Sequence, residues 1–238
     1  MYLYETHCHE KLCSACARAT PEELVENYKK KGYAGLVLTD HFLSGNTSVS
    51  YSLPYKEQIQ KYYDAYLKAK SYGEKIDFDV IFGFEHQYGG WKEMLVYGVE
   101  IDFLLKYPNL LSLGVDDFVK AVRKNGGVVV LAHPYRYRWY IDMNAESRFD
   151  LADGVEVYNA YNTSEENVKA LKKCREKGLI ALSGGDIHSG FDDKLNLSGV
   201  YLKNRVKNSK EFAEAIKSKD FDLRVLGKRV KNITENDL

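Results

Sequence analysis

The sequence lacks the features that would assign it to several special classes of protein. Lys plus Arg and Asp plus Glu both number 34, so no net charge attracts nucleic acid or an acidic membrane. No segment approaches the ~18 consecutive apolar residues of a membrane span, and the first residues lack the basic and apolar stretches of a signal peptide. We therefore expect a cytoplasmic protein with no nucleic-acid or membrane partner.

Cysteine and proline are also scarce, with four of each. In the cytoplasm, Cys8, Cys13, Cys16 and Cys174 are expected to be reduced thiols that are free to act as ligands. The prolines are scattered, and no repeat, low-complexity tract or linker marks a boundary. The chain is 238 residues long and 45% hydrophobic, which is enough for one substantial core. Residues 1–238 are therefore expected to form a single domain.

Short apolar runs alternate with longer amphipathic stretches along the chain. The apolar runs predict strands at 2–6, 35–39, 78–84, 94–99, 128–132, 154–158, 179–183 and 199–202. Capping residues and closing glycines favour helices from Thr20 to Gly32 and at 54–72, 115–125, 164–177 and 208–218. Strands this continuously apolar suit a parallel sheet buried on both faces. Repeated strand–helix units indicate a closed barrel or a doubly wound sheet.

Each of the six histidines follows the end of a predicted strand or the short loop that leaves it. They are His7 and His9 after the first run, His41 after the second, His86 after the third, His133 after the fifth and His188 after the seventh. Because all strands of a parallel barrel end at the same face, these side chains are expected to converge. We interpret His86 by itself as structural, because the neighbouring Glu85 already provides the expected ligand at the end of that strand.

Histidines and carboxylates at this density favour a metal site. Protonated imidazoles repel one another and neutral ones leave acceptors unused, whereas bound cations remove both problems. His7-x-His9 and Asp186-x-His188 also have the i, i+2 spacing with which a strand points two side chains to the same side. The pattern therefore predicts a cluster of metal ions at one end of the domain.

Five ordered motifs carry a more specific signal: Thr6-His7-Cys8-His9, Thr39-Asp40-His41, Gly83-Phe84-Glu85, Ala132-His133-Pro134 and Gly185-Asp186-Ile187-His188. From residue 2 to about residue 202 the sequence resembles the PHP family, named for polymerase and histidinol phosphatase domains. The resemblance implies an α/β fold, a distorted (β/α)7-type TIM-like barrel related to the amidohydrolases. It also implies a phosphoesterase with two or three divalent ions, typically zinc, manganese or iron, in the barrel mouth.

Carried over motif by motif, the resemblance implies a ligand set for each ion. Glu85 would bridge the first and second ions. The first ion would be held by His7, His9, Glu85 and Asp186, the second by Glu85 and His133, and the third by His41 and His188.

Two positions depart from the commonest pattern of the family. The third ion usually takes another His or Asp from the loop after the first motif, where this chain has Ser14-Ala15-Cys16. Cys16 would be that ligand, and its thiolate suits zinc or iron better than manganese; the alternative is a small buried apolar residue. Many members also place a histidine just before the fourth strand, where this chain has Glu93. Glu93 would either coordinate through oxygen or leave the second site weakened.

The catalytic residues expected from this arrangement are Asp186, His188, His41 and Arg136. Clustered divalent ions lower the pKa of a bridging water, and the resulting hydroxide is expected to attack phosphorus in line. Arg136 would grip the phosphate with two bonds, and Arg138 is the weaker candidate. The leaving oxygen would take its proton from His41, His188 or a water held by Asp40.

Further residues are expected to support the site. Glu156 ends another strand and is expected to orient a ligand or a metal-bound water. Tyrosines near the predicted mouth are expected to shape the substrate pocket: Tyr135, Tyr137, Tyr140, Tyr158 and Tyr161.

The function that these features favour is hydrolysis of a small-molecule phosphate monoester. Histidinol phosphate, phosphotyrosine peptides and nucleotides are substrates that the family handles. One alternative is a hydrolase of amides or lactones, as in the related barrels, and another is a non-catalytic metal-binding accessory module. Nothing in the sequence indicates an oligomeric state.

Overall fold

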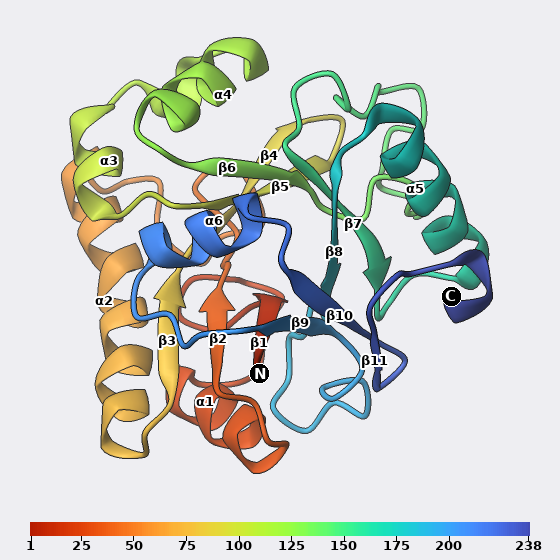
Figure 1. The fold of residues 1–238 in the computed structure, drawn as a ribbon. Coiled ribbons are helices and arrows are strands. Elements are labelled where there is room, and N and C mark those ends of the chain that lie inside the picture. Colours follow the sequence, from red (N-terminus) through yellow and green to blue (C-terminus); the bar gives the residue numbers. More distant parts are fainter.

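The computed structural model describes residues 1–238, whose strands form two mixed sheets (Figure 1). The first sheet has the order β11-β10-β9-β1-β2-β3, with β1 to β3 parallel and β9 to β11 antiparallel. Its strands are β1 (Tyr2–Cys8), β2 (Gly35–Leu38), β3 (Asp79–Phe82), β9 (Gly199–Leu202), β10 (Phe221–Val225) and β11 (Lys228–Val230).

The second sheet has the order β4-β5-β6-β7-β8. Its strands are β4 (Phe84–Gly89), β5 (Lys92–Tyr97), β6 (Val128–Leu131), β7 (Gly154–Asn159) and β8 (Ile180–Gly184). β6, β7 and β8 are parallel, but β5 runs antiparallel to both of its neighbours. The expectation of a wholly parallel sheet is therefore wrong for β5, which follows β4 through a hairpin and not through a helix. It is also wrong for β9, which pairs antiparallel with β1.

The two sheets meet at both sides of the site. β1 lies beside β8, with a single bridge between Cys8 and Ile187, and a second bridge joins His41 to Glu85. These bridges do not join the sheets into one continuous ladder. The predicted α/β class is confirmed, whereas the hydrogen-bonded strands do not close into the (β/α)7-type barrel that the resemblance implies.

The structure has six helices: α1 (Pro21–Lys30), α2 (Tyr55–Lys75), α3 (Ile101–Lys106), α4 (Val115–Lys124), α5 (Ser164–Lys177) and α6 (Ser209–Lys217). Two short 3-10 turns lie at Leu110–Ser112 and Glu235–Asp237. α1 and α2 cover the first sheet, α4 and α5 lie on the second, and α6 contacts both β3 and β5 (Figure 1). None of the helices is both long enough and apolar enough to cross a membrane.

Local sequence explains where several of these elements begin and divide. Thr20 caps α1 in a reciprocal capping box with Glu23, and Pro21 occupies the first turn. The predicted run at 78–84 divides at Gly83, where a Cβ would lie 2.9 Å from the side chain of Val37. The chain therefore crosses from the first sheet to the second at Gly83, and the crossing directs Glu85 toward the site.

The apolar core lies in two clusters of 35 and 28 buried residues. The second cluster contains side chains from both sheets and from α6, including Val37, Val130 and Phe212. Tyr97, in the same cluster, donates its hydroxyl to the carbonyl oxygen of Thr6 at 2.9 Å. This bond joins β5 to β1 one residue before His7 and fixes the floor beneath the site.

Candidate metal centre

Polar side chains from both sheets converge at one end of the molecule. They come from β1 and the segment after it (His7, His9), the segments after β2 and β6 (His41, His133), the beginning of β4 (Glu85), the beginning of β5 (Glu93) and the segment after β8 (Asp186, His188). β5 begins beside the end of β6, because the two strands are antiparallel. Glu93 therefore lies at the same end as the histidines.

Four of these side chains form a compact buried group. Nε2 of His7 lies 3.2 Å from Oε1 of Glu85 and 3.4 Å from Oδ1 of Asp186. Nε2 of His9 lies 3.0 Å from Nε2 of His7 and 3.2 Å from Oδ1 of Asp186. These are the four residues that the resemblance implies for the first ion.

Glu85 connects this group to a second one. Its Oε1 lies 3.2 Å from Nε2 of His133, and its Oε2 lies 2.8 Å from Nδ1 of His41. Glu93 faces the same space, with Oε2 3.6 Å from Nε2 of His133 and Oε1 3.5 Å from Nδ1 of His41. Glu93 thus lies beside the residues that the resemblance assigns to the second and third ions.

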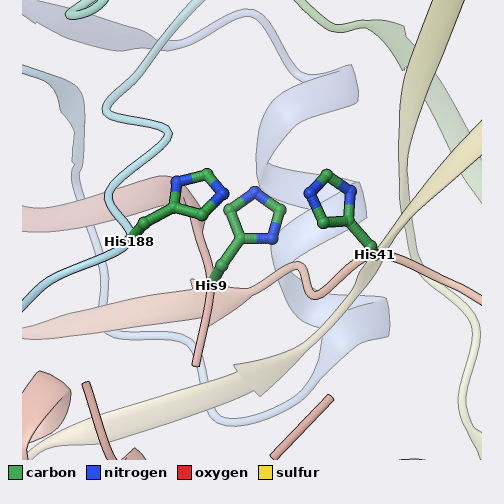
Figure 2. Close-up of side chains that lie close together, drawn as sticks. All are labelled: His9, His41 and His188. Atoms are coloured by element: carbon green, nitrogen blue, oxygen red, sulfur yellow. The ribbon is translucent and has the colours of Figure 1, made fainter. Parts of the chain in front are cut away.

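The rings of His9, His41 and His188 form a third group (Figure 2). The centroid of His9 lies 4.4 Å from that of His41 and 4.3 Å from that of His188. The Cys16 thiol hydrogen-bonds with His188 and His41, and it is exposed to solvent. The exposed thiol is incompatible with the alternative of a small buried apolar residue.

The donor groups fit divalent cations. Nδ1 of His41 and Oε2 of Glu85 are buried without a hydrogen-bond partner, because their orientation at 2.8 Å does not form a hydrogen bond. A shared cation would satisfy both atoms, and mixed imidazole and carboxylate donors suit zinc, iron or manganese. Within the cluster, four triads have donor atoms within 4.8 Å of one another: His7/His9/Glu85, His7/His133/Asp186, His41/Glu85/Glu93 and His9/His41/His188.

Most of the shifted pKa values in the metal-free cluster show that the cluster favours positive charge. Burial raises the pKa of Glu85, but the positive charges of His7 and His41 outweigh it and hold this pKa well below the usual range. Burial lowers the pKa of His7, but Asp186 and two further carboxylates raise it well above its usual value. His9 is the exception, because burial and two neighbouring imidazoles lower its pKa.

Buried partners fix the orientation of the ligand rings. Oε1 of Glu156 lies 3.0 Å from Nδ1 of His7, and its Oε2 accepts the backbone N–H of His133 at 2.9 Å. Nδ1 of His9 lies 3.2 Å from Oγ of Ser14, whose hydroxyl donates to Asp40 at 2.7 Å. Nε2 of both histidines is thereby directed into the cluster. Sequence reasoning anticipated a supporting role for Glu156 but missed Ser14.

Two residues of the predicted site have unusual backbone conformations. The φ angle is 30° at His133 and 56° at Asp186, in the left-handed region that favours glycine. Such conformations cost about 1–3 kcal/mol each and persist only where surrounding contacts enforce them. The fold thus holds both side chains in the cluster against a local backbone preference.

Arg136 is buried beside the cluster, and its guanidinium is largely held by protein groups. Its Nη1 donates to Oδ2 of Asp186 at 2.6 Å, its Nη2 to Oδ1 of Asn159 at 2.7 Å, and its Nε to Oδ1 of Asn162 at 3.0 Å. Two of its five N–H groups stay free for an anionic ligand. Arg138 instead donates to backbone carbonyls, including that of Tyr161 at 2.8 Å.

His86 lies away from the cluster. Its ring stacks on Phe118 at 3.9 Å between centroids, and its Nδ1 lies 2.9 Å from Oγ of Ser44. Burial lowers the pKa of His86 to about 3, so the ring is neutral. The structural interpretation of His86 agrees with these contacts.

A cavity of about 430 Å³ opens over the cluster. Its lining includes Cys16, His41, Glu93, His133, Arg136, Asp186 and His188, together with Asn46, Trp91, Trp139 and Tyr140. Of the five tyrosines expected near the mouth, only Tyr140 lines the cavity. Sequence reasoning missed both tryptophans, although each lies within six residues of a predicted ligand and so carried a positional signal.

Solved structures with a similar fold share little sequence with this chain. A two-domain protein from Bacteroides vulgatus containing a predicted PHP-like metal-dependent phosphoesterase has a TM-score of 0.68 at 15% identity, over 96% of this chain and 66% of that one. A protein from Bifidobacterium adolescentis, assigned as a metal-dependent phosphoesterase, has a TM-score of 0.59 at 16% identity, over 90% and 95% of the two chains. The lesion-specific endonuclease PfuEndoQ from Pyrococcus furiosus has a TM-score of 0.61 at 14% identity, over 91% and 56%. At these identities the likeness concerns the fold alone.

Sequence comparison assigns the family. A search of curated proteins finds no match. The family model of the PHP domain matches residues 5–223, a range that includes all the motifs from His7 to His188. The match confirms the resemblance seen in those motifs, and the chain belongs to the PHP domain family.

Proposed function

We propose that residues 1–238 form a single metal-dependent phosphoesterase domain that hydrolyses a small-molecule phosphate monoester. The observation that carries this proposal is the buried cluster of imidazole and carboxylate donors at the floor of a cavity of about 430 Å³. A buried guanidinium, that of Arg136, lines the same cavity and offers an anchor for an anion. Family membership supports the reaction class, and the cavity volume supports a small substrate.

Two or three divalent ions would be held by the ligands named above, including Cys16 and Glu93. These ions would supply Lewis acidity that activates water and balances the charge of the phosphate. Glu156 and Ser14 keep Nε2 of His7 and His9 directed inward. Arg136 presents two free N–H groups to a phosphoryl oxygen and keeps Asp186 oriented through the bond at 2.6 Å. His41 and His188 serve either as ligands or as donors of a proton to the leaving oxygen, because a nitrogen that binds a cation carries no proton.

The substrate class is the finer part of the proposal. One neighbour of similar fold is an endonuclease, so the fold alone does not exclude a nucleic-acid substrate. A formal net charge of zero supports a small molecule instead, because binding of a polyanion depends on an excess of Lys and Arg. The four free cysteines suit a reducing, cytoplasmic setting.

Phosphate release from a panel of monoesters, and product analysis after incubation with diesters and single-stranded DNA, test this proposal with zinc, manganese or iron supplied in turn. We expect turnover of monoesters, and we expect Glu85→Gln to lower kcat/KM by more than about 100-fold and to reduce the metal content per chain. Glu74→Gln, an exposed change on α2, is the matched control and should leave both unchanged.

The contrary outcomes separate the alternatives. Turnover of cyclic amides with no phosphate release would support the amidohydrolase alternative. Tight metal binding with no turnover of any ester or amide would support a non-catalytic accessory module. Preferential cleavage of DNA would contradict the choice of a small-molecule substrate.

A further inference from the structure

Both tryptophans of the chain line the cavity above the metal centre. Trp91 is 46% exposed and Trp139 is 93% exposed, although tryptophan is among the side chains that gain most from burial. The sequence contains no other tryptophan. Large apolar side chains gathered and exposed at the mouth of a polar cavity mark a surface that binds a ligand.

Tyr140 joins the two tryptophans into one group, here called the aromatic rim. The centroid of Tyr140 lies 5.9 Å from that of Trp91 at an interplanar angle of 74°, and 5.7 Å from that of Trp139 at 90°. Both contacts are edge-to-face, so Tyr140 does not stack on either tryptophan. The exposure of both tryptophans at the cavity leaves aromatic surface open to a ligand.

The backbone holds the rim in place at some cost. Trp91 has a φ of 59°, which is unusual for a bulky side chain. The preceding Gly90 accepts the backbone N–H of Asp142 at 3.0 Å, so the β4–β5 hairpin is tied to the loop that carries Trp139 and Tyr140. Strained backbone that surrounding contacts enforce is concentrated at functional sites.

We propose that the aromatic rim binds a planar ring in the leaving group of the substrate, so that the enzyme prefers phosphate esters whose alcohol carries an aromatic or heteroaromatic ring. This inference rests on the proposed function, because it places the phosphate at the metal centre and the ring at the rim. Planar rings stack on open tryptophan faces, whereas a saturated ring of equal size offers no π face. Trp139, the most exposed of the three, is the main specificity residue.

Binding tests the rim independently of turnover. Because Trp91 and Trp139 are the only tryptophans, the intrinsic tryptophan fluorescence of the protein reports the rim alone. We would titrate the metal-loaded protein with benzylphosphonate and with cyclohexylmethylphosphonate, which share charge and connectivity and are not hydrolysed. Benzylphosphonate should change the emission and bind about tenfold more tightly, a difference of about 1.4 kcal/mol.

Variants assign the preference to the rim. Trp139→Ala should abolish the tenfold difference, and Trp139→Phe should retain most of it. Tyr137→Ala, an exposed aromatic in the same loop that does not line the cavity, should leave the difference intact. Equal affinities in the unmodified protein, or an equal loss for both phosphonates in Trp139→Ala, would overturn the inference.

Kinetics with benzyl phosphate and cyclohexylmethyl phosphate distinguish this inference from the proposed function. Their leaving alcohols are both primary, so the chemical step is similar and the ring decides the preference. Turnover of both esters with equal kcat/KM would remove the ring preference and keep the phosphoesterase. Ring-selective binding without turnover of either ester would keep the rim as a subsite and remove the proposed reaction.

Discussion

At the scale of single residues, the thiol of Cys16 has a pKa below that of an ordinary cysteine. Burial raises the pKa of its thiol, but hydrogen bonds from His188 and His41 and their positive charge outweigh this and lower the pKa to about 6. The other three cysteines are buried. Cys16 is therefore the one thiol that combines exposure with a stabilised thiolate.

This environment predicts the pH dependence of alkylation. The thiolate is the reactive form, so a lowered pKa moves reactivity to lower pH, and Cys16 is mostly ionised at pH 7. Iodoacetamide should label the metal-free protein at a rate that rises through about pH 6 and levels off by about pH 8. Cys16→Ser should abolish rapid labelling, and bound zinc should protect the thiol. A midpoint near 9, or no protection, would contradict the environment or the proposed ligand role.

Sequence reasoning was effective for residues whose position follows from a strand end. His7, His41 and His188 could be predicted to meet because the strands before them are evident from apolar runs. The contacts of Ser14 and Asn159 could not be predicted, because each depends on a partner distant in sequence, at Asp40 and Arg136. The exposure of the tryptophans also depends on tertiary packing, which periodicity does not report.

At the scale of elements, the strands that sequence reasoning found are those buried on both faces. β6 reads Val-Val-Val-Leu and is fully buried, so its apolar run is unambiguous. β10 alternates apolar and charged residues over only five positions, and β11 is a short charged edge strand. α3 spans six residues without a side-chain cap. These three elements were not predicted, because each lacks the continuous apolar run or the capping residues on which the other predictions rested.

The β4–β5 hairpin offers a prediction about stability. Gly90 has a φ of 58°, and a Cβ there would collide with the Cβ of Ala145. Gly90→Ala should lower the free energy of unfolding by about 2–4 kcal/mol, from backbone strain together with the clash. Gly126→Ala is the matched control, because Gly126 also has a positive φ, of 87°, but a Cβ there meets nothing within 4 Å. It should cost only about 1–2 kcal/mol.

Urea denaturation of the two glycine variants provides the measurement, and tryptophan emission reports the rim in the same experiment. Equal losses for Gly90→Ala and Gly126→Ala would show that the hairpin does not depend on its contact with the loop around Ala145. A larger loss for Gly90→Ala with altered native-state emission would show that this contact positions Trp91.

At the scale of the whole molecule, strand direction is what sequence reasoning missed. A buried strand has the same apolar pattern in either direction, so the reversal of β5 between β4 and β6 was indicated only by Gly89-Gly90, a glycine pair typical of a hairpin turn. The side chains of the site converge nevertheless, because a strand that runs in the opposite direction begins at the edge where the neighbouring strands end. Glu93 thus reaches the cluster from the strand whose direction was predicted wrongly.

The charge balance of the cluster predicts how stability responds to pH in the metal-free protein. His7 and His41 have a pKa raised well above 6.5, so their contribution is complete below pH 6.5 and is lost as the pH rises through their folded pKa. Glu85 and Asp186 have a pKa lowered well below 4.5 and 3.8, so their contribution is complete above about pH 4.5 and is lost as the pH falls. Both contributions are complete between about pH 4.5 and 6.5, and the lowered pKa values of His9 and His86 oppose this window below pH 6.5.

Bound metal should change this balance, because a cation must displace the protons that the histidines hold. Zinc should therefore raise Tm little at pH 5.5 and progressively more up to pH 8.5. At pH 8.5, a zinc concentration about 100 times Kd stabilises the folded protein by about 2.7 kcal/mol. For a chain of this size, this corresponds to a rise in Tm of about 5–10 °C. Calorimetry of zinc binding in two buffers of different ionisation enthalpy should detect released protons, in numbers that fall as the pH rises. Glu85→Gln should reduce the rise in Tm at every pH. A rise in Tm that is independent of pH, without proton release, would mean that zinc binds away from these histidines.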